Sequence, residues 1–135
     1  RLIFAFLGDY VSKRLLVAIS YLLQAAGLVI LISATNLPQL YLFTLVFGLG
    51  WGAPTLLVAL RADYFGRRYF ATIAGVQQSI VAVGTIIGPV YAGWVFDTTG
   101  SYRPAILTIS AVIALAVPLA LFLPKPLLLL PTKTL

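Results

Sequence analysis

The sequence contains no cysteine, no histidine and no methionine, and its three acidic residues are all aspartates. Without cysteine the chain forms no disulfide and offers no thiolate to a metal ion. Acid–base or nucleophilic chemistry needs histidine, cysteine or carboxylates that are held together in a pocket. The aspartates, Asp9, Asp63 and Asp97, all lie outside the long apolar stretches. We therefore expect no enzyme activity, no metal site and no cofactor.

Charge of either sign is also scarce. Only 9% of the residues are charged, whereas 61% are hydrophobic and the mean hydropathy is +1.07. A soluble domain carries about a quarter charged residues, and 135 residues are too few to bury this much apolar surface in a core of their own. The composition therefore predicts an integral membrane protein.

Four apolar stretches are long enough to cross a bilayer, which takes about 20 helical residues. We predict transmembrane helices at about 15–34, 39–60, 69–96 and 102–123. Pro54 lies inside the second and is expected to kink it. Residues 1–8 are expected to be the end of a preceding helix and residues 124–135 a cytoplasmic tail. The fold class is all-α, and because the chain opens on Arg1 and has no methionine, we expect a piece of a longer protein.

The basic residues lie almost entirely on one side of these four predicted helices. If the helices cross in turn, one side carries Arg1, Lys13, Arg14, Arg61, Arg67, Arg68, Lys125 and Lys133. Only Arg103 lies on the other side, which is the positive-inside pattern. We expect a multi-pass protein of the plasma (cell inner) membrane with both ends of the chain in the cytoplasm. The net charge of +6 forms no continuous patch, so we expect anionic lipids and no nucleic acid as partners.

A hexapeptide is repeated before the first and the third predicted helix. Residues 9–14 read Asp-Tyr-Val-Ser-Lys-Arg and residues 63–68 read Asp-Tyr-Phe-Gly-Arg-Arg. Cytoplasmic loops collect basic residues in any case, but the shared acid, tyrosine and closing basic pair favour an ancestral repeat over that explanation. We call residues 9–14 the first basic hexamer and residues 63–68 the second basic hexamer.

Both hexamers resemble the loop signature of the major facilitator superfamily, a glycine followed by Asp-Arg-x-Gly-Arg-Arg. The matching residues are Asp9, Lys13 and Arg14 in the first hexamer, and Asp63, Gly66, Arg67 and Arg68 in the second. Tyr10, Ser12 and Tyr64 depart from it. The run from Gly88 to Tyr102 resembles the eleventh helix and following loop of monocarboxylate-transporter-like and oxalate/formate-antiporter-like members. On this registration the four helices are helices nine to twelve of a twelve-helix carrier.

The resemblance implies transport of a small organic solute, with monocarboxylates and other organic anions as candidates, by alternating access in a secondary carrier. It also implies that the hexamers form a latch, in which each aspartate faces a helix N-terminus of the other half and pairs with loop arginines. A plain surface ion pair is the simpler alternative. The partners would be the substrate and the missing amino-terminal helices, without which the fragment is expected to be inactive. A stand-alone, oligomeric four-helix small multidrug exporter is the alternative, although this sequence lacks the membrane glutamate that such a protein needs.

Polar residues inside the predicted helices fall on defined faces. On the second helix a stripe recurs at three- and four-residue spacing: Tyr41, Thr44, Gly48, Trp51 and Thr55. Since lipid-facing polar groups are costly, and since the tenth helix lines the cavity in this family, this stripe is our first candidate for substrate contact. Gln77 and Gln78 of the third helix are the second candidate. For Ser20, Gln24 and Gly27 of the first helix we expect contacts between helices.

Glycines recur at close spacing on two of the helices, which permits close helix packing. The residues assigned to this role are Gly48, Gly52, Gly84, Gly88, Pro89 and Gly93. Apart from Arg103 at the start of the fourth, no lysine, arginine, aspartate or glutamate falls within a predicted helix. We therefore expect the recognition of any charged group to come from outside these helices.

Overall fold

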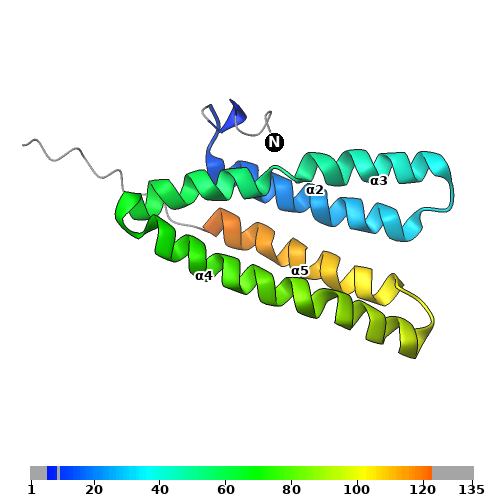
Figure 1. Cartoon of the computed structure of the whole chain (residues 1–135). Coiled ribbons are helices and arrows are strands. Elements are labelled where there is room, and N and C mark those ends of the chain that lie inside the picture. The colour runs from blue at the N-terminus through cyan, green and yellow to red at the C-terminus, as the bar shows by residue number, and fades with distance from the viewer. Residues whose placement is uncertain (1–5, 9, 123–135) are drawn as a thin grey trace, which may run out of the picture.

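The computed structural model describes residues 6–8 and 10–122, with the side chains of Ala53 and Arg67 left out. Residues 1–5, Asp9, residues 123–135 and the side chain of Arg67 lie outside the described residues, and so do the predictions made for them. The described part folds into four helices, α2 (Lys13–Ser33), α3 (Leu37–Gly50), α4 (Ala53–Thr99) and α5 (Arg103–Phe122) (Figure 1). The all-α prediction is confirmed.

Helix α4 reverses direction at Gly66. This glycine has φ 61° and ψ −171°, a conformation that residues with a Cβ rarely adopt, and it divides α4 into two antiparallel limbs. We call residues 53–65 the first limb and residues 68–99 the second limb. The first limb continues the direction of α3, so that the two together form one long crossing (Figure 1).

Four segments are long and apolar enough to cross a membrane. They are Lys13–Ser33, Leu37–Gly66, Arg68–Thr99 and Arg103–Phe122. These segments correspond one to one with the four predicted helices. The second segment extends to Gly66, six residues beyond the predicted end at Leu60, because no residue between Arg61 and Phe65 breaks the helix.

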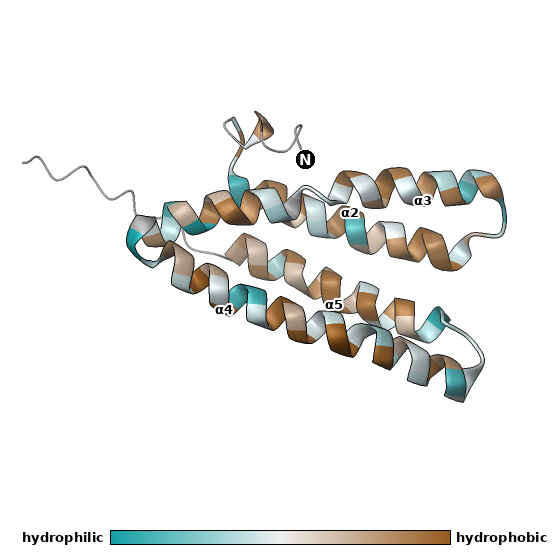
Figure 2. Ribbon diagram, viewed as in Figure 1, coloured by the Kyte–Doolittle hydropathy of each residue, from teal (hydrophilic) through white to brown (hydrophobic). Residues whose placement is uncertain are grey.

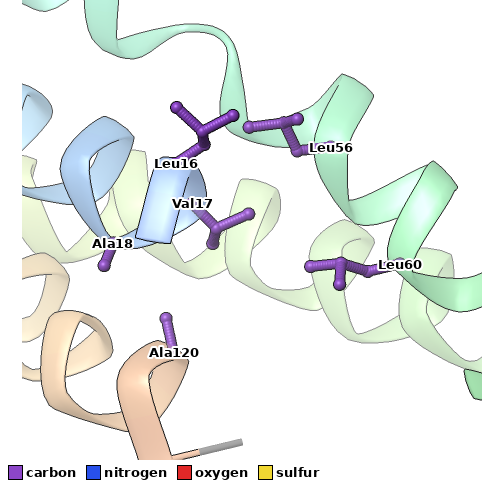
Figure 3. Close-up of a cluster of buried hydrophobic side chains, with 6 residues drawn as sticks. All are labelled: Leu16, Val17, Ala18, Leu56, Leu60 and Ala120. Atoms are coloured by element: carbon purple, nitrogen blue, oxygen red, sulfur yellow. The ribbon is translucent and has the colours of Figure 1, made fainter. Parts of the chain in front are cut away.

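Helix α2 is the centre of the bundle. It packs on one side against α3 and the first limb and on the other side against α5, while the second limb runs beside α5 (Figure 1). The core lies at the end of α2 near Lys13, where six buried apolar side chains from α2, the first limb and α5 form one cluster: Leu16, Val17, Ala18, Leu56, Leu60 and Ala120 (Figure 3). Most other large apolar side chains are exposed, as the surface of a membrane protein requires.

The second crossing is broken at its middle. Helix α3 ends at Gly50, where the amide of Trp51 turns back to donate to the carbonyl of Gly48 at 3.1 Å, and α4 begins at Ala53. Pro54 has no N–H for the carbonyl of Gly50, which instead accepts a hydrogen bond from Gln24 Nε2 of α2 at 2.8 Å. The predicted distortion at Pro54 is confirmed, and α2 satisfies the carbonyl that the proline leaves free.

Helix α2 contacts α3 closely at two glycines and α5 through a hydrogen bond. A Cβ on Gly27 would lie 2.9 Å from Cβ of Phe47, and a Cβ on Gly50 would lie 2.8 Å from the carbonyl oxygen of Ser20. Toward α5, Ser110 Oγ donates to the carbonyl of Ala25 at 3.1 Å. The role expected for the Ser20, Gln24 and Gly27 face, contact between helices, is confirmed.

The second limb is held far more loosely than the other helices. Its link to α5 includes a hydrogen bond from the Tyr91 hydroxyl to Thr108 Oγ1 at 3.1 Å. Ile80, Ile86 and Val90, along its length, are 69–70% exposed. Figure 2 shows that apolar colours cover most of the long sides of the helices, whereas hydrophilic residues lie near the turns and at a few positions within α2 and α4. The second limb therefore presents most of its surface to lipid or to other helices.

Candidate functional site

The two basic hexamers meet at one end of the bundle. Lys13, the first residue of α2, places its Nζ 2.7 Å from Oδ2 of Asp63, near the end of the first limb. The lysine side chain is 29% and the aspartate side chain 37% exposed. A pair this exposed contributes about 1 kcal/mol or less to stability. The ion pair matters for the site because it holds one hexamer beside the other.

Two other residues of the second hexamer have local roles at this end of the bundle. Gly66 forms the reversal of α4, and its positive φ explains why the second hexamer has a glycine at this position. The guanidinium of Arg68 lies 5.4 Å from the ring centroid of Tyr69. The sequence predicted two separate motifs, and it contained no signal that Lys13 of one pairs with Asp63 of the other.

The stripe Tyr41, Thr44, Gly48, Trp51 and Thr55 lies along α3 and the start of the first limb. Tyr41 is 70% exposed and Trp51 is 47% exposed. The Thr44 hydroxyl donates to the carbonyl of Leu40 in its own helix at 2.9 Å, so its hydrogen-bond donor already has a partner. Helix α2 packs on a different face, through Phe47 and Gly50. The stripe is therefore left open to whatever lies beyond this chain.

Trp51 is in ring contact with Phe47 of α3, which lies beside the stripe, on the side toward α2. The centroids of Phe43 and Phe47 are 5.4 Å apart, and those of Phe47 and Trp51 are 5.8 Å apart. Trp51 also caps the end of α3, directly at the break in the crossing. The indole is thus positioned by the helix end and by Phe47, and it can offer a flat apolar surface to a solute.

Gln77 and Gln78 line a cavity between the two limbs of α4. This interlimb cavity has a volume of about 450 Å³. Tyr21 of α2 and Pro54 and Arg61 of the first limb contribute to the same wall. The structure thus brings the two predicted glutamines together with a cation that the sequence placed in a loop.

The expectation that no charged residue lies within a membrane-spanning helix is wrong near the helix ends, where the four segments contain, besides Arg103, the residues Lys13, Arg14, Arg61, Asp63, Arg68 and Asp97. Of these, Arg61 lines the interlimb cavity. The residue lies on the helical turn that follows Leu57, to whose carbonyl Arg61 Nε donates at 3.4 Å, and its guanidinium is 5.6 Å from the ring centroid of Phe70. The missed signal was the uninterrupted helical sequence up to Gly66. A charged residue ends an uncharged stretch, but it does not end a helix.

The glycines expected at close contacts divide into two groups. A Cβ on Gly48, Gly84, Gly88 or Gly93 would meet no atom of the described chain within 4 Å. Close packing at these positions, and at Pro89 beside them, stays a prediction that concerns neighbours outside the described residues. Gly52 is buried at the break between α3 and α4. The glycines that α2 and α3 require for their own contact are Gly27 and Gly50.

Comparison with known proteins gives one family. The sequence profile described as "Major Facilitator Superfamily" matches residues 1–134. The chain is 37% identical over 73 residues to "Monocarboxylate transporter 12" of Rattus norvegicus and 38% identical over 71 residues to that of Mus musculus. It is 34% identical over 61 residues to "Monocarboxylate transporter 12-B" of Danio rerio.

These matches cover 53%, 52% and 44% of this chain, respectively. They cover 15%, 15% and 13% of the relatives, so the chain corresponds to a small part of their length. No solved structure matches the chain significantly.

Proposed function

This chain belongs to the major facilitator superfamily, and from that premise we propose that it forms part of a secondary carrier that moves a small organic solute by alternating access. The family and the four apolar helices make it a membrane transport protein. The small multidrug exporter is set aside, since the family match extends over nearly the whole chain. Alternating access requires two helix bundles around a shared site, so these helices act together with those of the other bundle.

The substrate class proposed is a small monocarboxylate or related organic anion. The support is the similarity to proteins named as monocarboxylate transporters. The stripe from Tyr41 to Thr55 carries hydroxyl and aromatic groups but no charge. It would hold the uncharged part of the solute, while the group that neutralises the carboxylate comes from another part of the carrier.

The hexamers are proposed to act as a latch at the cytoplasmic end. The ion pair between Lys13 and Asp63 carries this proposal, because it fixes the start of α2 to the end of the first limb. Holding these two elements together favours a conformer in which this end of the bundle stays compact. Breaking the pair would change the balance between conformers without touching the solute.

The observation that carries the transport proposal is the exposed Trp51 at the break in the second crossing, and its test is Trp51→Ala. Uptake of a panel of radiolabelled small monocarboxylates is measured in proteoliposomes with the protein that contains this chain. We expect Trp51→Ala to lower kcat/KM about tenfold, which corresponds to a loss of about 1.4 kcal/mol of transition-state stabilisation. The melting temperature should change little, because the indole is not part of the core. Trp94→Ala, which removes the other tryptophan, is the matched control and should leave KM unchanged. Equal kinetics for the wild type and Trp51→Ala would refute the assignment of this face.

A further inference from the structure

The interlimb cavity contains a cation for which the described chain supplies no anion. Arg61 lines this cavity, and its polar contact is with the carbonyl of Leu57 in its own helix. Of the two aspartates that the structure describes, Asp63 is paired with Lys13, and Asp97 lies at the far end of the second limb. An arginine on a membrane-spanning helix is costly unless it has a partner. A ligand with an anionic group would provide one.

The polar groups around Arg61 suit the head of such a ligand. Gln77 and Gln78 bring amide groups to the same cavity, and Tyr21 brings a hydroxyl. Guanidinium groups bind phosphate and carboxylate oxygens through two parallel hydrogen bonds, and neighbouring amides can donate to the remaining oxygens. The end of the bundle is basic as a whole, since Lys13, Arg14 and Arg68 also lie there.

The cavity continues into two apolar hollows. One, of about 470 Å³, runs along the second limb over Ile73, Val76 and Ile80 and shares Gln77 and Val81 with the interlimb cavity. The other, of about 150 Å³, lies over Leu60 and Phe65 and shares Arg61 and Gln77 with it. The three hollows therefore meet at Gln77. A ligand that fills them has one anionic head and one or two apolar chains.

From these contacts we propose that the cavity between the limbs of α4 is a binding site for an anionic phospholipid. Its phosphate binds Arg61 with the glutamines beside it, and its acyl chains lie in the apolar hollows. Basic pockets between membrane helices near the interface are suited to such head groups. The cavity contains Gln77 and Gln78, the second candidate for solute contact, and the proposal assigns these two glutamines to the lipid and not to the solute. The lipid would hold the loosely packed second limb against the first.

The apolar hollow distinguishes a lipid from a small solute. Ile80 is 69% exposed and Val76 is 59% exposed, so the hollow along the second limb opens on the outside of the chain. A small anion would use Arg61 and leave this hollow empty. An acyl chain gains free energy from each methylene that it places there. The proposal therefore requires that both the charge and the hollow contribute to binding.

The test uses fluorescent phosphatidylglycerol, with fluorescent phosphatidylcholine as the neutral probe. Both are titrated into the purified protein that contains this chain, in detergent. Both lipids carry a phosphate that can bind Arg61, but the cationic choline of phosphatidylcholine cancels its charge and would be repelled at this basic end of the bundle. We therefore expect phosphatidylglycerol to bind at least about tenfold more tightly than phosphatidylcholine. Arg61→Gln should reduce that preference to about twofold or less. Arg68→Gln is the matched control, because Arg68 lies at the same end but does not line the cavity.

A second variant tests the hollow independently of the charge. Ile80→Trp fills the hollow at an exposed position, so the fold should tolerate it, and both lipids should bind more weakly. This variant also decides the question if Arg61→Gln does not yield folded protein. Competition with sn-glycerol 3-phosphate separates the lipid from its head group, and we expect no displacement by this soluble phosphate at millimolar concentration.

Four results would overturn the proposal. If Arg61→Gln and Arg68→Gln weaken binding equally, the lipid follows surface charge and not the cavity. If sn-glycerol 3-phosphate displaces the lipid, or Ile80→Trp has no effect, the site is one for a soluble anion. If the transported monocarboxylate displaces the lipid at its transport KM, the cavity belongs to the solute pathway. Because lipid binding is measured without transport, failure here leaves the Trp51 test unaffected.

Discussion

At the scale of single residues, the contact between α2 and α3 depends on Gly50. Its carbonyl would have bonded to the next turn if Pro54 were any other residue, and Gln24 supplies the missing donor from the neighbouring helix. The donor can reach this carbonyl because Gly50 has no side chain between the helices. The three residues therefore act together. Pro54 leaves the carbonyl of Gly50 without a helical donor, Gln24 supplies a donor, and the missing side chain of Gly50 lets the two helices approach.

Gly50→Ala should destabilise the protein by about 1–3 kcal/mol, because the added methyl has no space. Its Cβ would lie 2.8 Å from both the carbonyl oxygen of Ser20 and Cγ of Gln24. Thermal unfolding in detergent measures the effect. Gly75→Ala is the matched control, since a Cβ there would meet nothing within 4 Å and alanine favours the helix. The two variants melting alike would contradict this account of the α2–α3 contact.

At the scale of elements, the exposed ion pair between Lys13 and Asp63 connects α2 with the first limb. Lys13→Asp or Asp63→Lys would each place two like charges together. We expect each single reversal to lower uptake by up to about fivefold, about 1 kcal/mol. The double variant restores an attractive pair in the opposite order and should recover most of the uptake rate. If the double variant is as slow as the slower single variant, the pair is not part of the latch.

The second limb carries Gly84 and Gly88 on one face, one turn apart, directly before Pro89. No described residue lies against that face, so the prediction concerns a neighbouring helix of the same carrier. Gly88→Leu should lower the melting temperature and the uptake rate together, because the added side chain separates the two helices. Ile87→Leu conserves volume at the next position and should leave both unchanged. A wild-type melting temperature for Gly88→Leu would show that no helix packs there.

At the scale of the whole molecule, the turns alternate between the two ends of the bundle. The ion pair between Lys13 and Asp63 marks one end. At the other end Arg103 Nη2 donates to the carbonyl of Ile32 at 3.1 Å, joining the start of α5 to the last turn of α2. The loop between α2 and α3 and the loop between α4 and α5 therefore lie together, opposite the reversal at Gly66 (Figure 1).

This arrangement gives a prediction of topology. The chain has no cysteine of its own, so single cysteines can be introduced as reporters. Ser12→Cys and Ala62→Cys should react with an impermeant maleimide only from the cytoplasmic side, where the basic residues collect. Asn36→Cys and Ser101→Cys should react only from the outside. Labelling of Ala62→Cys and Asn36→Cys from the same side would be incompatible with four crossings.

The sequence by itself determined the number and the approximate limits of the crossings. Bilayer thickness sets how long an apolar helix must be, and this condition can be evaluated one stretch at a time. The expected role of Gln24 and Gly27 followed in the same way, because the helical period alone places them on one face. The distortion at Pro54 was predictable too, since proline lacks an N–H wherever it stands.

Only the tertiary structure decided which of these faces meet. The pairing of Lys13 with Asp63, the choice of Gly50 over Gly48 at the contact with α2, and the place of Arg61 beside Gln77 all join residues from different helices. Local sequence fixes the direction in which a side chain points from the axis of its helix. It does not fix how far that helix is rotated about its axis relative to a neighbouring helix. That rotation is set by the packing of all the helices at once, and the polar and apolar pattern of one helix does not contain it.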